Sequence, residues 1–508
     1  MFYKKPLVIN LYLIVLFSLS TFCYSQEIEN KDDLFFKTST PEEQGIDSKL
    51  LADMLERIKE ENLKIRSVLI IRNNHLILES YVNPYNRYVT HDVKSVSKSI
   101  ISSVVGIALR ENIIDSLNQK IIDLLPEYFP VDVDSLKKKI TLAHLLSMST
   151  GLDLDENGPI MREIMSKEDW IKATFERPMV SAPGEQFAYS TLLTHSMSII
   201  LTKLSGMRLL DLSNKYLFEP LGIKQVHWEK GPDGYDSGGD KLWITPLAMA
   251  KIGYLYLNDG RWGNDQIVPA EWVKESIINR FDEFPDSNFS GYGYWWWLGK
   301  DKNYYARGAF GQIISVYPDK DMVIVFTGAD NYEWEMLIND YILPAIKTTN
   351  SLPPNPNAEK KINKICAELL NPHPQTPSLL PTTAQKISGK KYILEDNDLE
   401  FSDIMLQFDK PDSCRILIGY QESTLDLEIG LDNVYRVTNK VRWGMKNGDN
   451  TFALKGKWLN ENKFFIDFQE VGEPFYFDVE LELEEENLTA SFTWQPLKWK
   501  FQLEGTTE

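Results

Sequence analysis

Residues 95–109 read Ser-Val-Ser-Lys-Ser-Ile-Ile-Ser-Ser-Val-Val-Gly-Ile-Ala-Leu, an apolar run with one charged side chain. The run predicts a buried helix that begins near Ser95. On that helix Lys98 lies one turn after Ser95 and on the same face. Because a serine hydroxyl is a weak nucleophile until a nearby base takes its proton, the pair predicts a Ser95 nucleophile activated by Lys98. An ordinary helix N-cap at Ser95 is the alternative.

The bare Ser-x-x-Lys pattern is weak evidence, because it occurs three times, at Ser95, Ser135 and Ser388. Ser135 stands beside the basic run Lys137–Lys139, and Ser388 opens the C-terminal segment. Both are therefore expected at the solvated surface. Only Ser95 leads into an apolar helix.

Helical and strand patterns alternate between residues 38 and 350. Near each end of this segment two short apolar runs flank a turn, which predicts two β-hairpins. Helices between the hairpins indicate an α+β domain in which helices flank an antiparallel sheet completed by both ends of the segment. The runs and turns are Val68–Ile71, Asn73-Asn74 and Leu76–Leu78, and then Ile313–Tyr317, Pro318–Asp321 and Met322–Phe326.

The chain changes character after this domain. Repeated prolines in residues 351–385 flank one short helix around Ile362–Leu369 and predict a linker. In residues 386–508 apolar side chains recur at every second position, as in Phe475–Glu484, which is typical of half-buried strands. We expect a separate small β-sandwich or barrel there.

The N-terminus has the features of a secretory signal peptide. Two lysines precede an apolar stretch from Leu7 to Phe22, and Ser25 is a small residue suited to cleavage. We expect a signal peptide over residues 1–25, a short extension over 26–37, and a periplasmic or secreted protein with no membrane span after cleavage. A lipid anchor on Cys23 is the less favoured alternative.

Composition excludes several classes of protein. The net charge is −19, from 54 basic and 73 acidic residues, which argues against a nucleic-acid partner because phosphate binding needs clustered cations. The three cysteines, Cys23, Cys366 and Cys414, cannot form a disulfide framework, and whether the last two pair stays open. No Cys/His cluster has zinc spacing, so no metal site is expected.

Several stretches around the predicted nucleophile agree in order and spacing with one family. Besides Ser95–Lys98 they are Ile140–Leu152, Pro183–Ser190, Leu217–Ile223 and Thr245–Ala250. From about Pro41 to Ile346 the chain resembles the penicillin-recognising serine hydrolases, in the branch of class C β-lactamases, related esterases and 6-aminohexanoate-dimer hydrolases. The resemblance implies a β-lactamase/transpeptidase-like domain.

The resemblance also implies partners for the nucleophile. Tyr189 matches the tyrosine of the family's second motif and is expected to relay a proton between Ser95, Lys98 and the leaving group. The asparagine of that motif, whose amide binds the substrate carbonyl, is replaced by Thr191, which offers one donor instead of two. This replacement weakens the case for penicillin-type recognition.

The third motif of the family, Lys-Thr-Gly, corresponds to part of Ala306–Gln312. Ala306 replaces the family lysine, and Arg307 supplies charge instead only if it faces the site. By the resemblance, the backbone N–H groups of Ser95 and Ala309 hold the oxyanion. The residues expected to bind the substrate are Thr191, Arg307, Gly308, Gly311 and Gln312.

The expected function is hydrolysis of an amide or ester through an acyl-serine intermediate. The substrate is a small molecule or short peptide, and the reaction needs no metal or organic cofactor. Loss of the asparagine and the lysine favours a linear amide or ester, while a true β-lactamase or D-peptidase stays open. A non-catalytic binding or sensor protein with the same fold is the second alternative, and a scaffold whose C-terminal domain carries the function is the third.

Overall fold

The computed structural model describes residues 36–129, 131–154, 156, 158–281, 289–443 and 450–507. The expected signal peptide, Cys23 and nearly all of the expected extension therefore lie outside the described residues. Within the described ranges, no helix is both long and apolar enough to cross a membrane.

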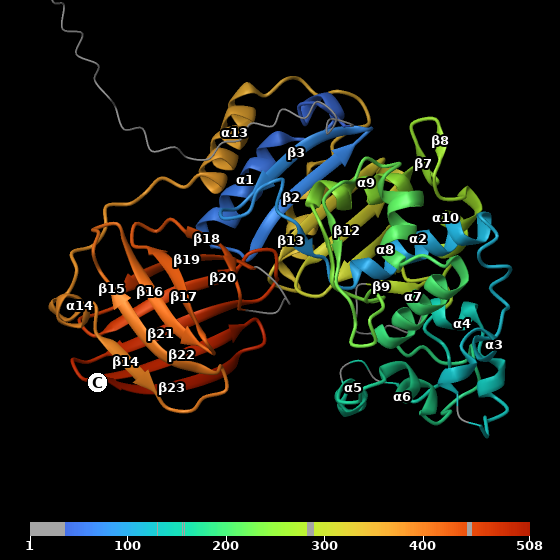
Figure 1. Cartoon of the computed structure of the whole chain (residues 1–508). Helices are drawn as coiled ribbons and strands as arrows, with labels where there is room; N and C mark the ends of the chain where they lie inside the picture. Colours follow the sequence, from blue (N-terminus) through green and yellow to red (C-terminus); the bar gives the residue numbers. More distant parts are fainter. Residues whose placement is uncertain are drawn as a thin grey trace, which may run out of the picture. The chain divides into compact units, whose positions relative to one another are not determined.

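An eight-stranded sheet organises the N-terminal part of the chain (Figure 1). In spatial order its strands are β1 (Lys37–Thr38), β3 (His75–Tyr81), β2 (Ile65–Arg72), β13 (Met322–Gly328), β12 (Gln312–Tyr317), β11 (Tyr304–Gly308), β10 (Trp297–Gly299) and β9 (Phe289–Tyr292). Strands β2 and β13, far apart in sequence, pair antiparallel from Arg72↔Met322 to Ile65↔Gly328. The two ends of the segment thus complete one sheet, as predicted; β1, parallel to β3, is the exception to the antiparallel pattern.

Both predicted hairpins are confirmed. In the β2–β3 turn Asn73 and Asn74 have φ values of 47° and 61°, which suits the tight turns that join twisted antiparallel strands. The β12–β13 turn passes through a 3₁₀ turn at Pro318–Lys320 and ends at Asp321, whose φ is 46°. Asparagine and aspartate tolerate this left-handed backbone better than most residues.

Helices cover both faces of the sheet (Figure 1). Helix α1 (Ser48–Glu60) packs its apolar face into one core together with α13 (Pro356–Leu370). On the opposite face α9 (Pro246–Leu257) approaches closely at Gly253, where a Cβ atom would lie 2.6 Å from both Ile314 and Val323. The helix expected around Ile362–Leu369 is longer than predicted and packs on the sheet domain, because its apolar face meets that of α1.

The remaining helices build the region around the sheet. Helix α2 is buried from Val96 to Ala108 and packs through Gly106 against Trp272 of α10. The helices are α2 (Val96–Arg110), α3 (Ile121–Leu124), α4 (Leu142–Leu146), α5 (Pro159–Met165), α6 (Trp170–Glu176), α7 (Thr191–Ser205), α8 (Leu209–Ser213), α10 (Ala270–Ser276), α11 (Glu333–Leu337) and α12 (Leu343–Ala345). Short strands are β4 (His91–Asp92), β5 (Val226–Trp228), β6 (Leu242–Ile244), β7 (Arg261–Trp262) and β8 (Asp265–Gln266).

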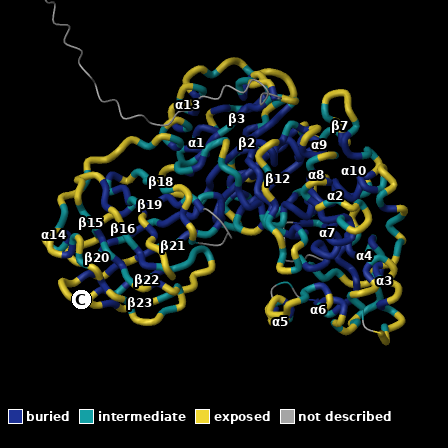
Figure 2. The backbone as a smooth tube through the Cα atoms, in the orientation of Figure 1, coloured by how far each residue is buried: buried dark blue, intermediate teal, exposed yellow. Residues whose placement is uncertain are grey.

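The C-terminal part is a closed β-barrel, which settles the sandwich-or-barrel alternative. Its strands run antiparallel from β14 to β17 and from β19 to β23, β14 pairs with β23, and β17 pairs with β19 to close the ring. Alternate side chains fill its interior, and buried and more exposed positions follow one another along its strands (Figure 2). A short helix, α14 (Thr382–Ile387), precedes strands β14 (Lys391–Leu394), β15 (Phe401–Gln407), β16 (Ser413–Tyr420), β17 (Ser423–Gly430), β18 (Arg436–Val441), β19 (Asn450–Trp458), β20 (Lys463–Glu470), β21 (Tyr476–Leu483), β22 (Asn487–Gln495) and β23 (Trp499–Thr507).

Candidate active site

Ser95 precedes α2, with Lys98 one turn further on. Ser95 occupies the N-cap position of α2, but its side chain makes no capping hydrogen bond to the helix. Its Oγ instead accepts a hydrogen bond of 2.9 Å from Lys98 Nζ. Ser95 is half-buried, whereas Lys98 is 1% exposed. The predicted pair is therefore in contact, with the hydroxyl nearer the surface and the amine in the interior.

Lys98 has two further acceptors. Its Nζ donates to Thr191 Oγ1 at 3.0 Å and to the Gly239 carbonyl oxygen at 2.7 Å. A Cβ atom on Gly239 would lie 2.5 Å from Thr191 Cγ2 and 3.1 Å from Lys98 Nζ, so only glycine allows this approach. Sequence reasoning missed Gly239, because a glycine in a loop carries no sign of the lysine that it meets.

Thr191, at the start of α7, is tied to a carboxylate. Glu156 accepts hydrogen bonds from the Thr191 backbone N–H at 2.8 Å and from its hydroxyl. Negative charge is favoured at a helix N-terminus, where backbone N–H groups lack partners within the helix. Glu156 was not predicted, since it lies 35 residues before Thr191 in a segment without a motif.

Tyr189 faces the same centre. Lys98 Nζ lies 5.1 Å from the centroid of the Tyr189 ring. The ring stacks on Trp297 at a centroid distance of 5.9 Å and meets Tyr292 edge-on at 6.2 Å. Trp297 is half-buried beside Tyr189, whereas Trp295 and Trp296, which precede it in the chain, are core residues. These contacts place the Tyr189 ring beside the lysine amine.

The turn after β11 carries Ala309, which is exposed. Gly308 lies against the segment before Ser95, since a Cβ atom on Gly308 would be 2.2 Å from the Val93 carbonyl oxygen. Gly311 has a φ of 83°, and Asn331 accepts a hydrogen bond from the Phe310 N–H at 2.7 Å. The turn is therefore fixed beside the start of α2.

Arg307 lies beside an aromatic ring, and Gln312 contacts the backbone of the turn. The Arg307 guanidinium lies 5.2 Å from the Phe289 ring centroid, and burial lowers its pKa from the ordinary value. Gln312 is 1% exposed, and its amide donates to the carbonyl oxygens of Phe310 and Gly328. Gln312 thus braces the turn, and both of its N–H contacts go to backbone.

The residue before Ser95 is held by the barrel. Lys94 has a φ of 49°, and its Nζ lies 2.6 Å from Asp92 and 3.2 Å from Glu473, in the loop between β20 and β21. Burial alone would lower the pKa of Lys94, but the two carboxylates outweigh it and hold that pKa above its ordinary value. No pattern in the sequence predicted that Glu473 lies beside the residue before Ser95.

Two histidines have structural roles. His195 Nε2 lies 2.9 Å from Asp233, and its Nδ1 accepts a hydrogen bond from the Gly238 N–H at 3.2 Å. His144 Nδ1 accepts from the Thr141 N–H and completes a capping box on α4. Neither contacts Ser95, and among the described residues no group of three or more His, Cys, Asp or Glu side chains could hold a metal ion.

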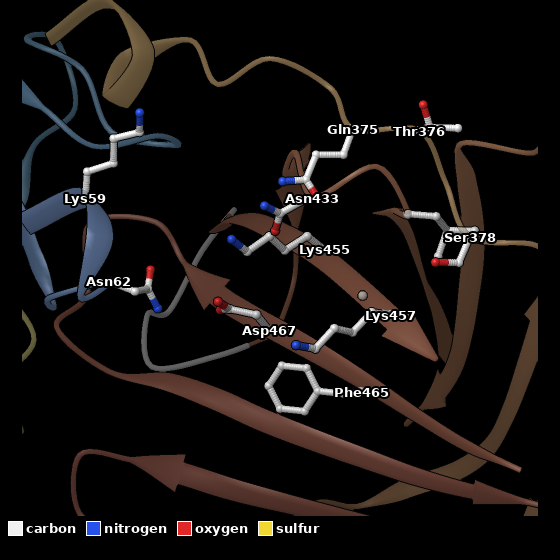
Figure 3. Close-up of a pocket in the computed structure, with 12 residues that line it drawn as sticks. Lys59, Asn62, Gln375, Thr376, Ser378, Asn433, Lys455, Lys457, Phe465 and Asp467 are labelled. Carbon is white, nitrogen blue, oxygen red and sulfur yellow. The ribbon is translucent and has the colours of Figure 1, made fainter. Parts of the chain in front are cut away.

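A polar pocket of about 530 Å³ lies elsewhere, between α1 and the barrel strands β19 and β20 (Figure 3). Lys455, Lys457 and Asp467 project from the barrel, while Lys59 comes from α1 and Asn62 from the turn that follows it. It shares no residue with the centre around Ser95.

Comparison with known proteins agrees with the resemblance seen in the sequence. A family model described as Beta-lactamase matches residues 57–343. The 6-aminohexanoate-dimer hydrolase of Paenarthrobacter ureafaciens is 21% identical over 334 residues, which are 59% of this chain and 82% of that enzyme. An uncharacterized protein of Alkalihalophilus pseudofirmus is 27% identical over 236 residues, which are 41% of this chain and 63% of that protein, so the chain spans less than two thirds of this relative.

Solved structures share the fold. A Bacillus anthracis protein assigned as a 6-aminohexanoate-dimer hydrolase superposes with a TM-score of 0.52 at 18% identity, over 63% of this chain and 89% of that chain. EstCE1, a hydrolase with promiscuous acyltransferase activity, superposes with a TM-score of 0.50 at 17% identity, over 59% of this chain and 99% of its own. At such identities the likeness concerns the fold alone.

Proposed function

Because the chain belongs to the Beta-lactamase family, we propose that it hydrolyses an amide or ester bond through an acyl-Ser95 intermediate. Family membership supports a serine hydrolase in general. The single observation that carries the finer proposal is the 2.9 Å hydrogen bond between buried Lys98 Nζ and Ser95 Oγ. A positioned base at this distance can take the hydroxyl proton as the nucleophile attacks.

The reaction has two halves. Ser95 Oγ attacks the substrate carbonyl carbon while its proton passes to Lys98, and the backbone N–H groups of Ser95 and Ala309 stabilise the oxyanion. Collapse of this intermediate breaks the bond to the leaving group, which receives the proton through Tyr189. Water then attacks the acyl ester and gives a proton to Lys98 and Tyr189. The bond to Ser95 Oγ breaks, Ser95 Oγ takes up that proton, and the acid is released.

The site favours uncharged linear substrates over penicillins. Ala306, which replaces the family lysine, is fully buried and supplies no charge. Thr191 is occupied by the Glu156 carboxylate, which adds negative charge near Lys98. A substrate carboxylate at this end of the site would be repelled by Glu156. We therefore place linear amides and esters ahead of β-lactams.

A substrate screen tests the proposal. p-Nitrophenyl acetate, a linear ω-amino amide, a D-amino-acid amide and a chromogenic cephalosporin are assayed with the wild type, Ser95→Ala and Ser135→Ala. Ser135 is the matched control, since it begins the same four-residue pattern on an exposed segment. Ser95→Ala is expected to lose at least about 10³-fold in kcat/KM on the cleaved substrates, and Ser135→Ala to lose nothing. Turnover that persists in Ser95→Ala contradicts the proposal, and a folded wild type that cleaves nothing favours the binding-protein alternative.

The proposal includes export. The support is the basic start, the apolar stretch and the small residue at position 25. N-terminal sequencing of protein recovered from the periplasm or medium of a bacterial host is expected to begin at Gln26. A mature protein that keeps its first 25 residues, or stays in the cytoplasm, contradicts this part of the proposal.

A further inference from the structure

The barrel has an aromatic cavity at one end. The cavity measures about 210 Å³. Its aromatic lining is buried at Phe452, Phe468 and Tyr476, whereas the other aromatic side chains that line it are half-buried and lie at the barrel mouth. Barrel mouths are common binding places for small ligands. The chief lining side chains are Trp443, Phe468, Phe475, Phe477, Trp494 and Phe501.

One ring joins this cavity to the catalytic centre. Phe475 lines the cavity and packs on Trp494 at a centroid distance of 4.9 Å. The same ring lies 5.1 Å from the ring of Phe310, the residue after Ala309. Lys94 Nζ, from the residue before Ser95, lies 4.8 Å from its centroid. Phe475 therefore touches the neighbours of both backbone N–H groups proposed to hold the oxyanion.

The loop that carries Phe475 is anchored on the hydrolase domain. The Gly472 carbonyl oxygen accepts a hydrogen bond of 3.0 Å from the Asp92 N–H, and a Cβ atom on Gly472 would lie 2.6 Å from the Thr90 carbonyl oxygen. Glu473 pairs with Lys94, and its carbonyl oxygen accepts a hydrogen bond from Arg66. These contacts fix the barrel mouth beside the nucleophile.

The size and lining of the cavity define its occupant. At roughly 30 Å³ for each water-sized group, it holds on the order of seven non-hydrogen atoms, which suits a phenyl ring or a chain of about six to eight carbons. Its wall is almost entirely apolar, and Glu470 also lines it. An apolar wall disfavours a charged occupant such as the carboxylate of a free fatty acid.

We propose that the barrel mouth binds the apolar part of the substrate while Ser95 attacks its carbonyl group. This inference rests on the proposed hydrolase function. It assigns the substrate class as uncharged esters or amides that carry an aromatic ring or a medium-length alkyl chain.

The test compares p-nitrophenyl acetate with p-nitrophenyl octanoate in the full chain. Leu399 lines the cavity, and Leu399→Trp places an indole in it. The wild type is expected to prefer octanoate at least tenfold in kcat/KM. Leu399→Trp is expected to reduce that preference at least tenfold, by raising KM for octanoate more than KM for acetate. Ile393→Trp adds the same group at a position that is 39% exposed and outside the cavity, and is expected to change neither rate.

Binding without turnover separates this inference from the hydrolase proposal. Ser95→Ala is titrated with uncleaved p-nitrophenyl octanoate, followed by quenching of tryptophan fluorescence, and adding Leu399→Trp is expected to weaken binding at least tenfold. Unchanged preference and binding in folded Leu399→Trp overturn the barrel site. Binding that depends on Leu399 while no ester is cleaved overturns the hydrolase proposal alone. If Leu399→Trp does not fold, Trp494→Leu enlarges the cavity and is expected to shift the preference towards p-nitrophenyl decanoate; no shift overturns the site.

Discussion

At the scale of single residues, the geometry around Lys98 explains why distant positions converge. Lys98 Nζ lies within hydrogen-bonding distance of three oxygen atoms, namely Ser95 Oγ, Thr191 Oγ1 and the Gly239 carbonyl oxygen. One comes from the same helix, one from α7 and one from a loop. These contacts orient the amine towards the hydroxyl. Small displacements of the loop should therefore lower the catalytic rate.

Gly239→Ala tests this arrangement. The added methyl group would lie 2.5 Å from Thr191 Cγ2 and 2.6 Å from Thr194 Oγ1, so these side chains must shift, and at 3.1 Å it also crowds Lys98 Nζ. We expect kcat to fall at least about tenfold in an ester assay, because misplacement by about 1 Å can cost about 10² in rate. Gly206→Ala is the control: it sits at φ 68° with nothing within 4 Å, so it should lower Tm without lowering kcat. Equal kcat in Gly239→Ala and wild type contradicts the proposed positioning.

The sequence located those site residues that stand in local patterns. Ser95 and Lys98 are three positions apart on a helix and meet as predicted. Gly239 and Glu156 could not be predicted, because their roles depend on contacts that the chain makes only when folded. The proposed roles of Tyr189 and Ala309 follow from the resemblance.

At the scale of elements, hairpins were easier to predict than helix lengths. The hairpins follow from local alternation and turn residues such as Asn73 and Asn74. Helix α13 begins before its expected range, with Asn355 as its N-cap and Pro356 in its first turn, and its Ile362, Ile365 and Leu369 pack into the core with α1. That partner lies some 300 residues earlier, so a local pattern could not reveal it.

The loop between β20 and β21 connects the barrel to the segment before Ser95, because its Glu473 pairs with Lys94. In a double-mutant cycle, Lys94→Met and Glu473→Gln are each expected to destabilise the protein, with a coupling energy of about 1–3 kcal/mol in urea unfolding, because the pair is buried. Lys203 and Glu127 form an exposed pair that serves as the control, with coupling below about 1 kcal/mol. Coupling no larger than that of the control contradicts the anchoring role of this loop.

At the scale of the whole molecule, the packing of the barrel against the hydrolase domain could not be predicted from the sequence. Arg66 and Glu473, which are in contact, are 407 positions apart. The alternation of side chains in residues 386–508 predicted strands. It did not predict that the sheet closes into a barrel, or which surface of the hydrolase domain the barrel contacts.

The pH dependence of stability is a global property to which Glu333 contributes. Burial, followed by the charge of Asp330, raises the pKa of Glu333 from 4.5 to about 7. The folded state therefore holds this proton to higher pH than the unfolded chain, so this contribution falls as pH rises from about 4.5 to 7 and then stays low. Glu333→Gln should raise Tm more at pH 8 than at pH 5. A Tm difference that is constant across this range contradicts the assignment.

The most direct test of the account is to identify the residue that becomes acylated. The wild type, Ser95→Ala and Lys98→Met are treated with a fluorophosphonate probe, and the adduct is located by peptide mass spectrometry. We predict a single adduct on Ser95 in the wild type, no adduct in Ser95→Ala, and labelling at least about 10²-fold slower in Lys98→Met. An adduct on another residue, or ester hydrolysis by a wild type whose Ser95 is never labelled, would contradict the central claim.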